Sequence, residues 1–217
     1  MRYAVIVVMV VTSTFTARNS SAADIPETTL VVRTYSAIPI ADVDRAFAID
    51  AANEILQPTG IRVRWIACDA SPAMPDGRCL APLAVNELAI RFVPQAPETN
   101  ARANEVVLGY SLIDRHATFA VLATIYVERV ERLASACNVP WTTVLGRAVA
   151  HEIGHLLLGT AEHASTGLMR AVWPRLAIER NLARDFQFSA EEAVALHRAV
   201  DARDASARPS PVVWGTE

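Results

Sequence analysis

The first half of the chain alternates short β-branched runs with a helical pattern. Residues 30–35 are β-branched and bounded by turn residues, which is typical of a strand. Residues 61–66 predict a second strand, in which Arg62 and Arg64 alternate outward. Residues 39–57 between them have helical spacing, with apolar side chains at three- and four-residue steps: Ile40, Val43, Phe47, Ala51 and Ile55. This strand–helix–strand order predicts parallel neighbouring strands joined by a right-handed crossover.

Three more strands and three helices are predicted downstream. Residues 87–93 and 119–127 are apolar and β-rich, whereas residues 106–112 form a weaker strand interrupted by Gly109, which suits an edge or a bulge. Residues 128–136 have a helical pattern. A longer helix begins near Pro140 and reaches Leu158, and its almost wholly apolar sequence predicts burial on most sides. Ser189 and Glu192 have the spacing of a capping box that opens a last helix.

These elements predict one α+β domain at residues 24–205. Its sheet is expected to be mixed, mostly parallel and twisted, with about five strands, a buried helix that carries the site and a C-terminal helix. The chain turns polar from Asp201 onward, and we expect residues 206–217 to form a flexible tail.

Charge and hydropathy argue against two classes of protein, those that bind nucleic acid and those that span a membrane. The 217 residues include 20 basic side chains, all of them Arg, and 23 acidic ones, giving a formal net charge of −3. An acidic balance without a basic patch argues against a nucleic-acid partner. Nothing after residue 23 is long and apolar enough to cross a bilayer, so we expect no stable membrane insertion.

The N-terminus has the pattern of a secretory signal peptide. Arg2 precedes an apolar run over residues 3–11, and small residues at 20–23 suit cleavage between Ala23 and Asp24. A membrane anchor is the alternative, but the apolar run is too short to span a bilayer. We therefore predict a signal peptide at residues 1–23 and an exported protein, either periplasmic or extracellular.

The cysteines fit an oxidising compartment. Cys68 and Cys79 could close a disulfide across a loop that contains Pro72, Pro75 and Gly77. Cys137 is left over, and a buried or partly buried free thiol is favoured over a metal-binding or inhibitory role.

The candidate chemistry lies in the buried helix at His151-Glu152-Ile153-Gly154-His155. Two histidines four residues apart share one face of a helix and can bind one tetrahedral zinc ion. Glu152 could take the proton of a metal-bound water. The alternative is a structural helix whose histidines are satisfied by hydrogen bonds, since buried polar side chains need partners of some kind.

A third metal ligand is expected just after this helix. Gly159 can adopt a left-handed backbone and end the helix, which lets the chain turn back and present His163. A downstream glutamate is the other common way to complete such a site, and the candidates are Glu179, Glu191 and Glu192. We favour His163 because Gly159 supplies a reason for an immediate turn.

The segment from His151 to Met169 resembles the signature of the metzincin zinc peptidases, HExxHxxGxxH followed by a tight turn with a methionine beneath the metal. The resemblance, which extends to small exported bacterial proteins with this motif, implies His151, His155 and His163 as zinc ligands. It also implies Glu152 as general base and Met169 as the Met-turn residue. Here Gly159 and His163 follow the second histidine by four and eight residues, where the family has three and six. The segment between His155 and His163 must therefore accommodate two more residues than the family has.

These observations predict an exported zinc-dependent hydrolase, with an endopeptidase acting on peptides or proteins as the favoured activity. By resemblance, the substrate would lie along the edge strand at residues 106–112. Three alternatives stay open: a zinc hydrolase with a glutamate as third ligand, an amidase acting on cell-wall peptides, and a non-catalytic exported zinc-binding module.

Overall fold

The protein is described here from a computed structural model, which covers residues 28–68, 77–95, 107–113 and 119–207. The predicted signal peptide and most of the predicted tail lie outside these residues. The elements are β1 (Thr28–Ser36), α1 (Asp42–Leu56), η1 (Gln57–Thr59), β2 (Ile61–Ala67), α2 (Gly77–Leu80), β3 (Glu87–Val93), β4 (Gly109–Ser111), β5 (Leu122–Tyr126), α3 (Val127–Cys137), α4 (Trp141–Leu158), α5 (Arg175–Arg180), η3 (Ala183–Phe186) and α6 (Ala190–Ala207).

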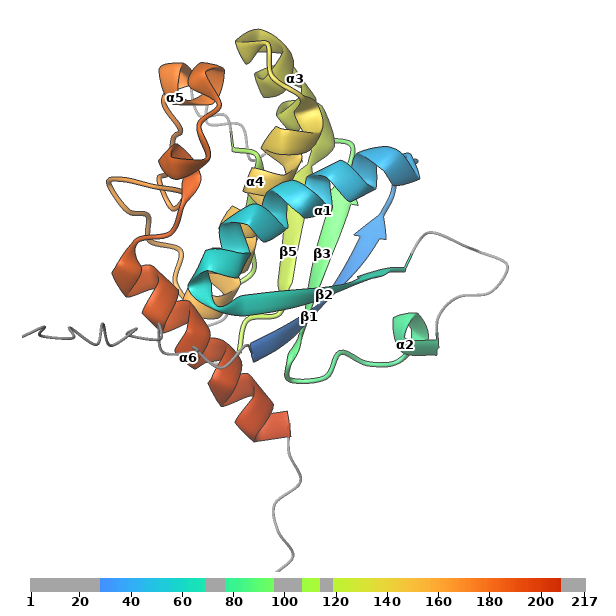
Figure 1. Ribbon diagram of the computed structural model, residues 1–217. Coiled ribbons are helices and arrows are strands. Elements are labelled where there is room, and N and C mark those ends of the chain that lie inside the picture. Colours follow the sequence, from blue (N-terminus) through green and yellow to red (C-terminus); the bar gives the residue numbers. More distant parts are fainter. Residues whose placement is uncertain (1–27, 69–76, 96–106, 114–118, 208–217) are drawn as a thin grey trace, which may run out of the picture.

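A five-stranded sheet forms the centre of the fold, with strand order β2-β1-β3-β5-β4 (Figure 1). The first four strands are mutually parallel, and β4 pairs with β5 in the antiparallel sense at one edge. Leu30 and Val32 of β1 point to the face covered by α1 and α4 and are fully buried. The predicted α+β class and the mixed, mostly parallel sheet are therefore confirmed, as is the parallel pairing of β1 with β2.

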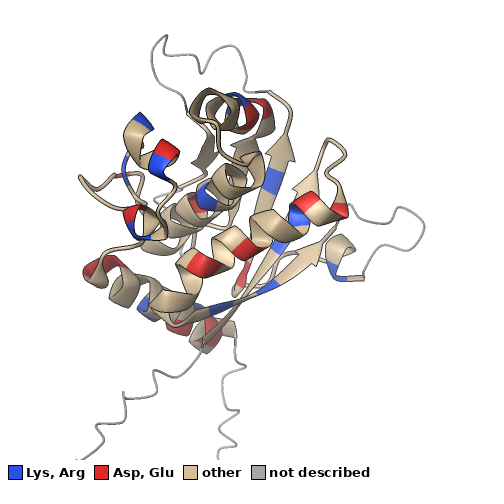
Figure 2. Cartoon of the chain, turned by 45° about the horizontal axis from the view of Figure 1, so that its top comes forward, with Lys and Arg blue, Asp and Glu red and all other residues tan. Residues whose placement is uncertain are grey.

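Helix α1 buries the predicted face only near its C-terminal end, where Ile55 is 4% exposed. Val43 and Phe47 were expected to face the core, yet they are 60% and 56% exposed, and the buried side includes Ala48 and Ala52. The reason is the close approach of α4, since a Cβ atom on Gly146 would lie 2.4 Å from the backbone oxygen of Ala48. Small side chains allow this contact where large ones do not. Acidic side chains are spaced along the outward side of α1 (Figure 2).

The C-terminal helix is longer than its apolar pattern indicated. The predicted capping box is present, because the Ser189 backbone N–H donates to the Glu192 carboxylate at 2.7 Å and the Glu192 N–H donates to Ser189 Oγ at 3.1 Å. The helix then continues through the polar segment as far as Ala207, so it includes two residues of the predicted tail.

Buried Arg203 explains this extension of α6. Arg203 is 1% exposed, and its guanidinium donates to the carbonyls of Val85 at 3.1 Å, Ala120 at 2.6 Å and Leu156 at 3.2 Å. A polar stretch of sequence therefore supplies one of the most deeply buried side chains of the core, which a count of hydrophobic residues does not detect.

The opposite face of β1 holds the disulfide-bonded segment. The predicted Cys68–Cys79 disulfide is present, and Cys137 is a buried free thiol as expected. Arg33 points to this face, donates to the carbonyl of Ala81 at 2.8 Å and pairs with Glu87. The disulfide ties α2 to the end of β2, and Arg33 ties the residues after α2 to β1 and β3.

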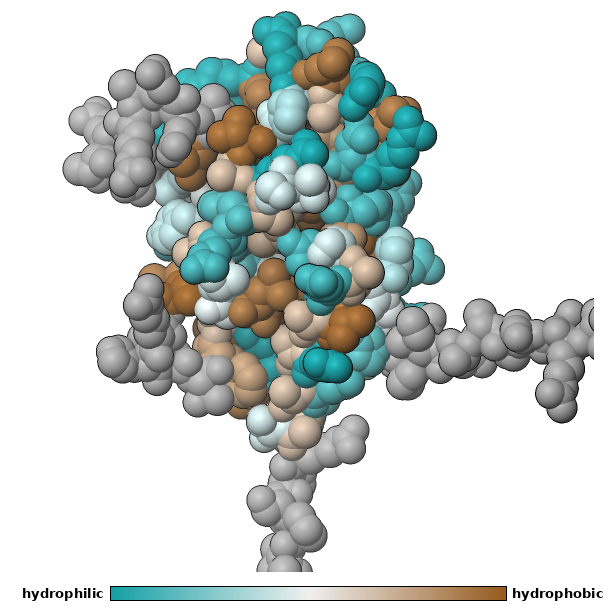
Figure 3. Space-filling view, turned by 90° about the vertical axis from the view of Figure 1, so that its left-hand side faces the viewer, coloured by the Kyte–Doolittle hydropathy of each residue, from teal (hydrophilic) through white to brown (hydrophobic). Residues whose placement is uncertain are grey.

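None of the helices within the described residues is both long and apolar enough to cross a membrane. On the face that carries α5 and α6, hydrophobic residues form small patches separated by polar ones (Figure 3). Isolated patches of this kind are normal on the surface of a folded domain.

The close contact between α1 and α4 predicts that a methyl group added at Gly146 lowers the stability of the fold. Gly146→Ala should lower the free energy of unfolding by about 1–3 kcal/mol because the new Cβ overlaps the backbone of α1. Helix propensity alone would raise stability. Chemical denaturation of the full chain measures the difference. Gly77→Ala is the control, since a Cβ there has no atom within 4 Å. A more stable Gly146→Ala variant would contradict the close approach of the helices.

Candidate active site

Three histidine side chains converge beside the β4 edge of the sheet. His151 and His155 lie one turn apart on α4, and their Nε2 atoms are 3.0 Å apart. His163 comes from the loop after α4, and its Nε2 atom lies 3.3 Å from that of His155. Two nitrogen ligands of one tetrahedral zinc ion, each about 2.0–2.1 Å from the metal, lie about 3.3 Å apart. These two separations match that value, and the ligand nitrogens of all three histidines lie within 4.8 Å of one another, which suits a shared metal ion.

Backbone carbonyls fix the tautomers of two of these imidazoles. Nδ1 of His151 lies 2.9 Å from the Leu168 carbonyl oxygen, and Nδ1 of His155 lies 2.7 Å from that of Thr160. A carbonyl oxygen only accepts, so each Nδ1 carries the proton and each Nε2 presents a lone pair. Two lone pairs facing each other at 3.0 Å repel unless a cation lies between them. The chemistry of the donor set thus fits a metal ion.

Burial keeps these imidazoles in the form that binds metal. Desolvation, reinforced by neighbouring His155, lowers the pKa of His151 to about 4. Desolvation likewise lowers the pKa of His155. Both rings are consequently neutral near pH 7, and a neutral imidazole is the form that ligates zinc.

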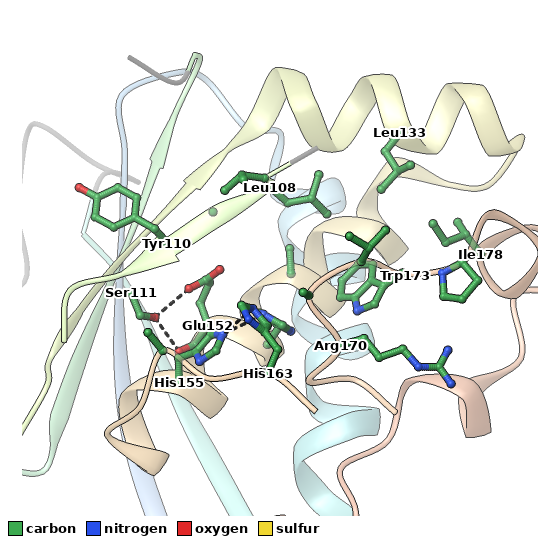
Figure 4. Close-up of a pocket in the computed structure, with 18 of the residues that line it drawn as sticks. Leu108, Tyr110, Ser111, Leu133, Glu152, His155, His163, Arg170, Trp173 and Ile178 are labelled. Atoms are coloured by element: carbon green, nitrogen blue, oxygen red, sulfur yellow. Dashed lines mark hydrogen bonds between the residues drawn. The ribbon is translucent and has the colours of Figure 1, made fainter. Parts of the chain in front are cut away.

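Glu152 points from α4 towards the edge strand (Figure 4). The hydroxyl of Ser111 lies 2.8 Å from Glu152 Oε2 and 3.0 Å from the Glu152 backbone oxygen. A Cβ atom on Gly109 would lie 3.1 Å from Glu152 Oε1 and 2.6 Å from the Thr124 backbone oxygen, so only glycine lets β4 pass this close to the carboxylate. Burial raises the pKa of Glu152 to about 7, and the hydrogen bond from Ser111 opposes that rise.

The turn after α4 absorbs the two extra residues of the motif. Helix α4 runs on to Leu158, and Gly159, with φ +65°, ends it by donating its N–H to the His155 carbonyl at 2.9 Å. The next residue, Thr160, supplies the carbonyl that holds the His155 ring. An extended helix followed by a wider loop therefore brings His163 back to the other two histidines.

Met169 lies directly beneath the helix turn that carries the histidines. Its side chain is 1% exposed, and a Cβ atom on Gly154 would lie 2.6 Å from Met169 Sδ. The turn is anchored by the Leu168 N–H, which donates to the Gln187 carbonyl at 3.0 Å. Gly167 has φ +71° and faces the same carbonyl at a distance that excludes a Cβ. The backbone that supports His151 is thus tightly constrained.

The alternative third ligands lie in other environments. Glu179 pairs with Arg175 at 2.6 Å, and Glu192 caps α6. Across the described ranges, only the trio His151, His155 and His163 brings three metal-binding side chains within reach of one ion. The predicted His151, Glu152, His155, His163 and Met169 are therefore brought together, and the glutamates are not.

A cavity of about 770 Å³ extends from the histidines into the protein. Its far wall is apolar and comes from the residues on either side of β4, from α3 and α5, and from the loop before α5 (Figure 4). The wall includes Leu108, Ile113, Leu133, Cys137, Trp173 and Ile178. Ser111 and Trp173 are site residues that sequence analysis missed. The predicted edge strand pointed to the neighbourhood of Ser111, whereas no sequence pattern marked Trp173.

Several solved structures have a similar fold. Metalloproteinase-II from Bacteroides fragilis aligns with 80% of this chain at 16% identity and a TM-score of 0.46, and the match spans only 53% of that protein. Archaemetzincin from Methanopyrus kandleri aligns with 84% of this chain and 99% of its own, at 15% identity and a TM-score of 0.47. A zinc-dependent peptidase from Methanocorpusculum labreanum aligns with 77% of this chain and 99% of its own, at 15% identity and a TM-score of 0.48.

The structural neighbours are thus metallopeptidases by name. No protein-family model matches the sequence. No curated protein matches it significantly either. Because the TM-scores are below 0.5 and the identities near 15%, the roles of individual residues depend on the site geometry alone.

The hydrogen bond to Glu152 predicts a role for Ser111 in stability. Ser111→Ala should lower the free energy of unfolding by about 1–2 kcal/mol, since it leaves a buried carboxylate without this donor. Ser206→Ala is the matched control, because that hydroxyl bonds the Ala202 carbonyl on the exposed side of α6. Chemical denaturation of both variants should show a loss for Ser111→Ala alone, and equal stabilities would contradict the assignment.

Proposed function

We propose that this chain is an exported zinc-dependent hydrolase, with endopeptidase activity favoured, in which His151, His155 and His163 bind the metal. The observation that carries the proposal is the convergence of three Nε2 atoms, two of them on imidazoles whose Nδ1 protons are held by backbone carbonyls. The predicted signal peptide supports export, and the Cys68–Cys79 disulfide is consistent with an oxidising compartment.

The chemistry that zinc supplies when bound is Lewis-acid activation of water and of a peptide carbonyl. The Ser111 hydroxyl donates to Oε2 of Glu152 at 2.8 Å, so we assign proton transfer to the other oxygen, Oε1. Oε1 therefore accepts the proton of the attacking water, and the carboxyl group then returns it to the nitrogen of the leaving amine. A pKa near neutrality suits a group that must both accept and donate a proton.

The edge strand offers a place for an extended peptide. The Leu112 N–H donates to the Leu122 carbonyl at 2.9 Å, and the Tyr126 N–H donates to the Leu108 carbonyl at 2.8 Å. Hydrogen-bonded residues alternate along an antiparallel pair, so the backbone groups of residues 109 and 111 face away from β5. A peptide that pairs with this edge lies beside Glu152 and the histidines, which favours β-strand addition as the mode of binding.

Zinc content tests the proposed metal site. The purified wild type should hold about one zinc per chain when metal-replete, and His151→Ala and His163→Ala should each lose it, because a two-histidine site binds zinc weakly. His197→Ala is the control, since this histidine lies on α6, where it pairs with Asp201. Elemental analysis after removal of free metal gives the stoichiometry.

Two results of this measurement would contradict the proposed three-histidine site. A wild type without zinc under these conditions overturns the proposal. Zinc retained by His163→Ala transfers the third-ligand role to a downstream glutamate such as Glu191.

Glu152→Gln separates catalysis from metal binding. The variant should keep its zinc, and its hydrolysis of an unfolded protein should fall by about 10²–10⁴-fold because general base catalysis is lost. Parallel assays with cell-wall peptides distinguish a protease from an amidase. Zinc-loaded wild type that hydrolyses neither substrate, or does so without dependence on Glu152, would support a non-catalytic zinc-binding module instead.

A further inference from the structure

Trp173 and His151 share one hydrogen-bond acceptor. The indole Nε1–H of Trp173 donates to the Leu168 carbonyl at 2.9 Å, and His151 Nδ1 donates to the same oxygen at 2.9 Å. A carbonyl oxygen has two lone pairs, so both bonds can form together. The Leu168 N–H, in the preceding peptide group, donates to the Gln187 carbonyl at 3.0 Å, so hydrogen bonds hold the peptide groups on both sides of Leu168.

The Trp173 ring is in turn held by α4 itself. Trp173 packs edge-on against Phe186, with ring centroids 5.4 Å apart, and edge-on against His151 at 6.0 Å. The Arg147 guanidinium lies 3.7 Å from the Phe186 ring centroid and donates to Asn181 Oδ1 at 2.7 Å. Arg147 and His151 are one turn apart on the same face of α4. The contacts therefore run from Arg147 through Phe186 and Trp173 to His151, and both ends of this series lie on α4.

Trp173 also belongs to the wall of the cavity. Its ring lies between the histidines and the apolar part formed by Leu133 and Ile178 (Figure 4). A substrate side chain that enters this cavity contacts the same indole that holds the carbonyl partner of His151. Trp173 therefore contacts both the metal-binding histidine His151 and the part of the cavity that a substrate side chain would enter.

We propose that Trp173 is a positioning residue for the metal ligand His151, acting through the shared Leu168 carbonyl. The inference rests on the zinc site proposed above. Loss of the indole N–H leaves the Leu168 carbonyl with one donor fewer, so the His151 ring becomes less well oriented. Partners of metal-bound histidines typically contribute about 10–100-fold to metal affinity.

Trp173→Phe removes the N–H and keeps an aromatic ring in the wall. Zinc affinity, measured by competition with a chelator, should weaken by about 10-fold, the lower end expected for a group that acts through a shared acceptor. The visible spectrum of the Co²⁺-loaded chain should change as well, because it reports ligand geometry. Neither measurement depends on hydrolytic activity.

Trp65→Phe is the matched control. Trp65 on β2 is also half-buried, and its Nε1–H donates to Asn53 Oδ1 at 3.0 Å, at the opposite edge of the sheet from β4. This variant should bind zinc as the wild type does, with any loss of stability similar to that of Trp173→Phe. Zinc affinity unchanged in Trp173→Phe, or weakened equally in both variants, overturns the inference.

Phe186→Leu provides a second test if Trp173→Phe does not fold. It keeps the indole N–H but removes the ring on which Trp173 packs, and zinc affinity should fall, by less than the roughly 10-fold expected for Trp173→Phe. An unchanged affinity would again overturn the inference. A wild type that binds no zinc would instead defeat the proposed function, so the two failures are distinguishable.

Discussion

The near-complete burial of α4 is the constraint on which the site depends. The helix carries Arg147, His151, Glu152 and His155 into the interior, where each polar group needs a partner. The partners come from outside the helix: the Leu168 and Thr160 carbonyls, the Ser111 hydroxyl and the Asn181 amide. The loops and strands that cover α4 are therefore the same ones that build the candidate active site.

Local sequence signals predicted the framework because each depends on neighbours in the chain. β-branched runs marked the strands, the β-α-β order marked parallel pairing, and Ser189 with Glu192 marked the start of α6. Of the buried face of α1, Ile55 was found in this way but Ala48 and Ala52 were not. Hydrophobicity favours Phe47, but the actual contact is set by the missing side chain of Gly146 on another helix. The packing distance, and not the periodicity, decides which residues are buried.

The residues of the candidate site also fall into two groups, those that local sequence predicted and those that only the three-dimensional packing reveals. The spacing of His151, Glu152 and His155 on one helix, and the turn at Gly159, were visible in the sequence. The roles of Ser111 and Trp173 were not. Ser111 is 41 residues from Glu152 and reaches it only because β4 reverses direction at the sheet edge. Trp173 is five residues from its acceptor, yet its importance depends on His151 using the same oxygen.

The buried guanidinium of Arg203 joins the C-terminal helix to distant parts of the chain. Its carbonyl acceptors, on Val85, Ala120 and Leu156, precede it by 118, 83 and 47 residues. Contacts over such separations form late, because long loops must close first. The three carbonyls come together only when the sheet and α4 have packed, so the docking site of α6 depends on contacts made across most of the domain. On the ribosome, the domain consequently stays incomplete until its C-terminal helix has emerged.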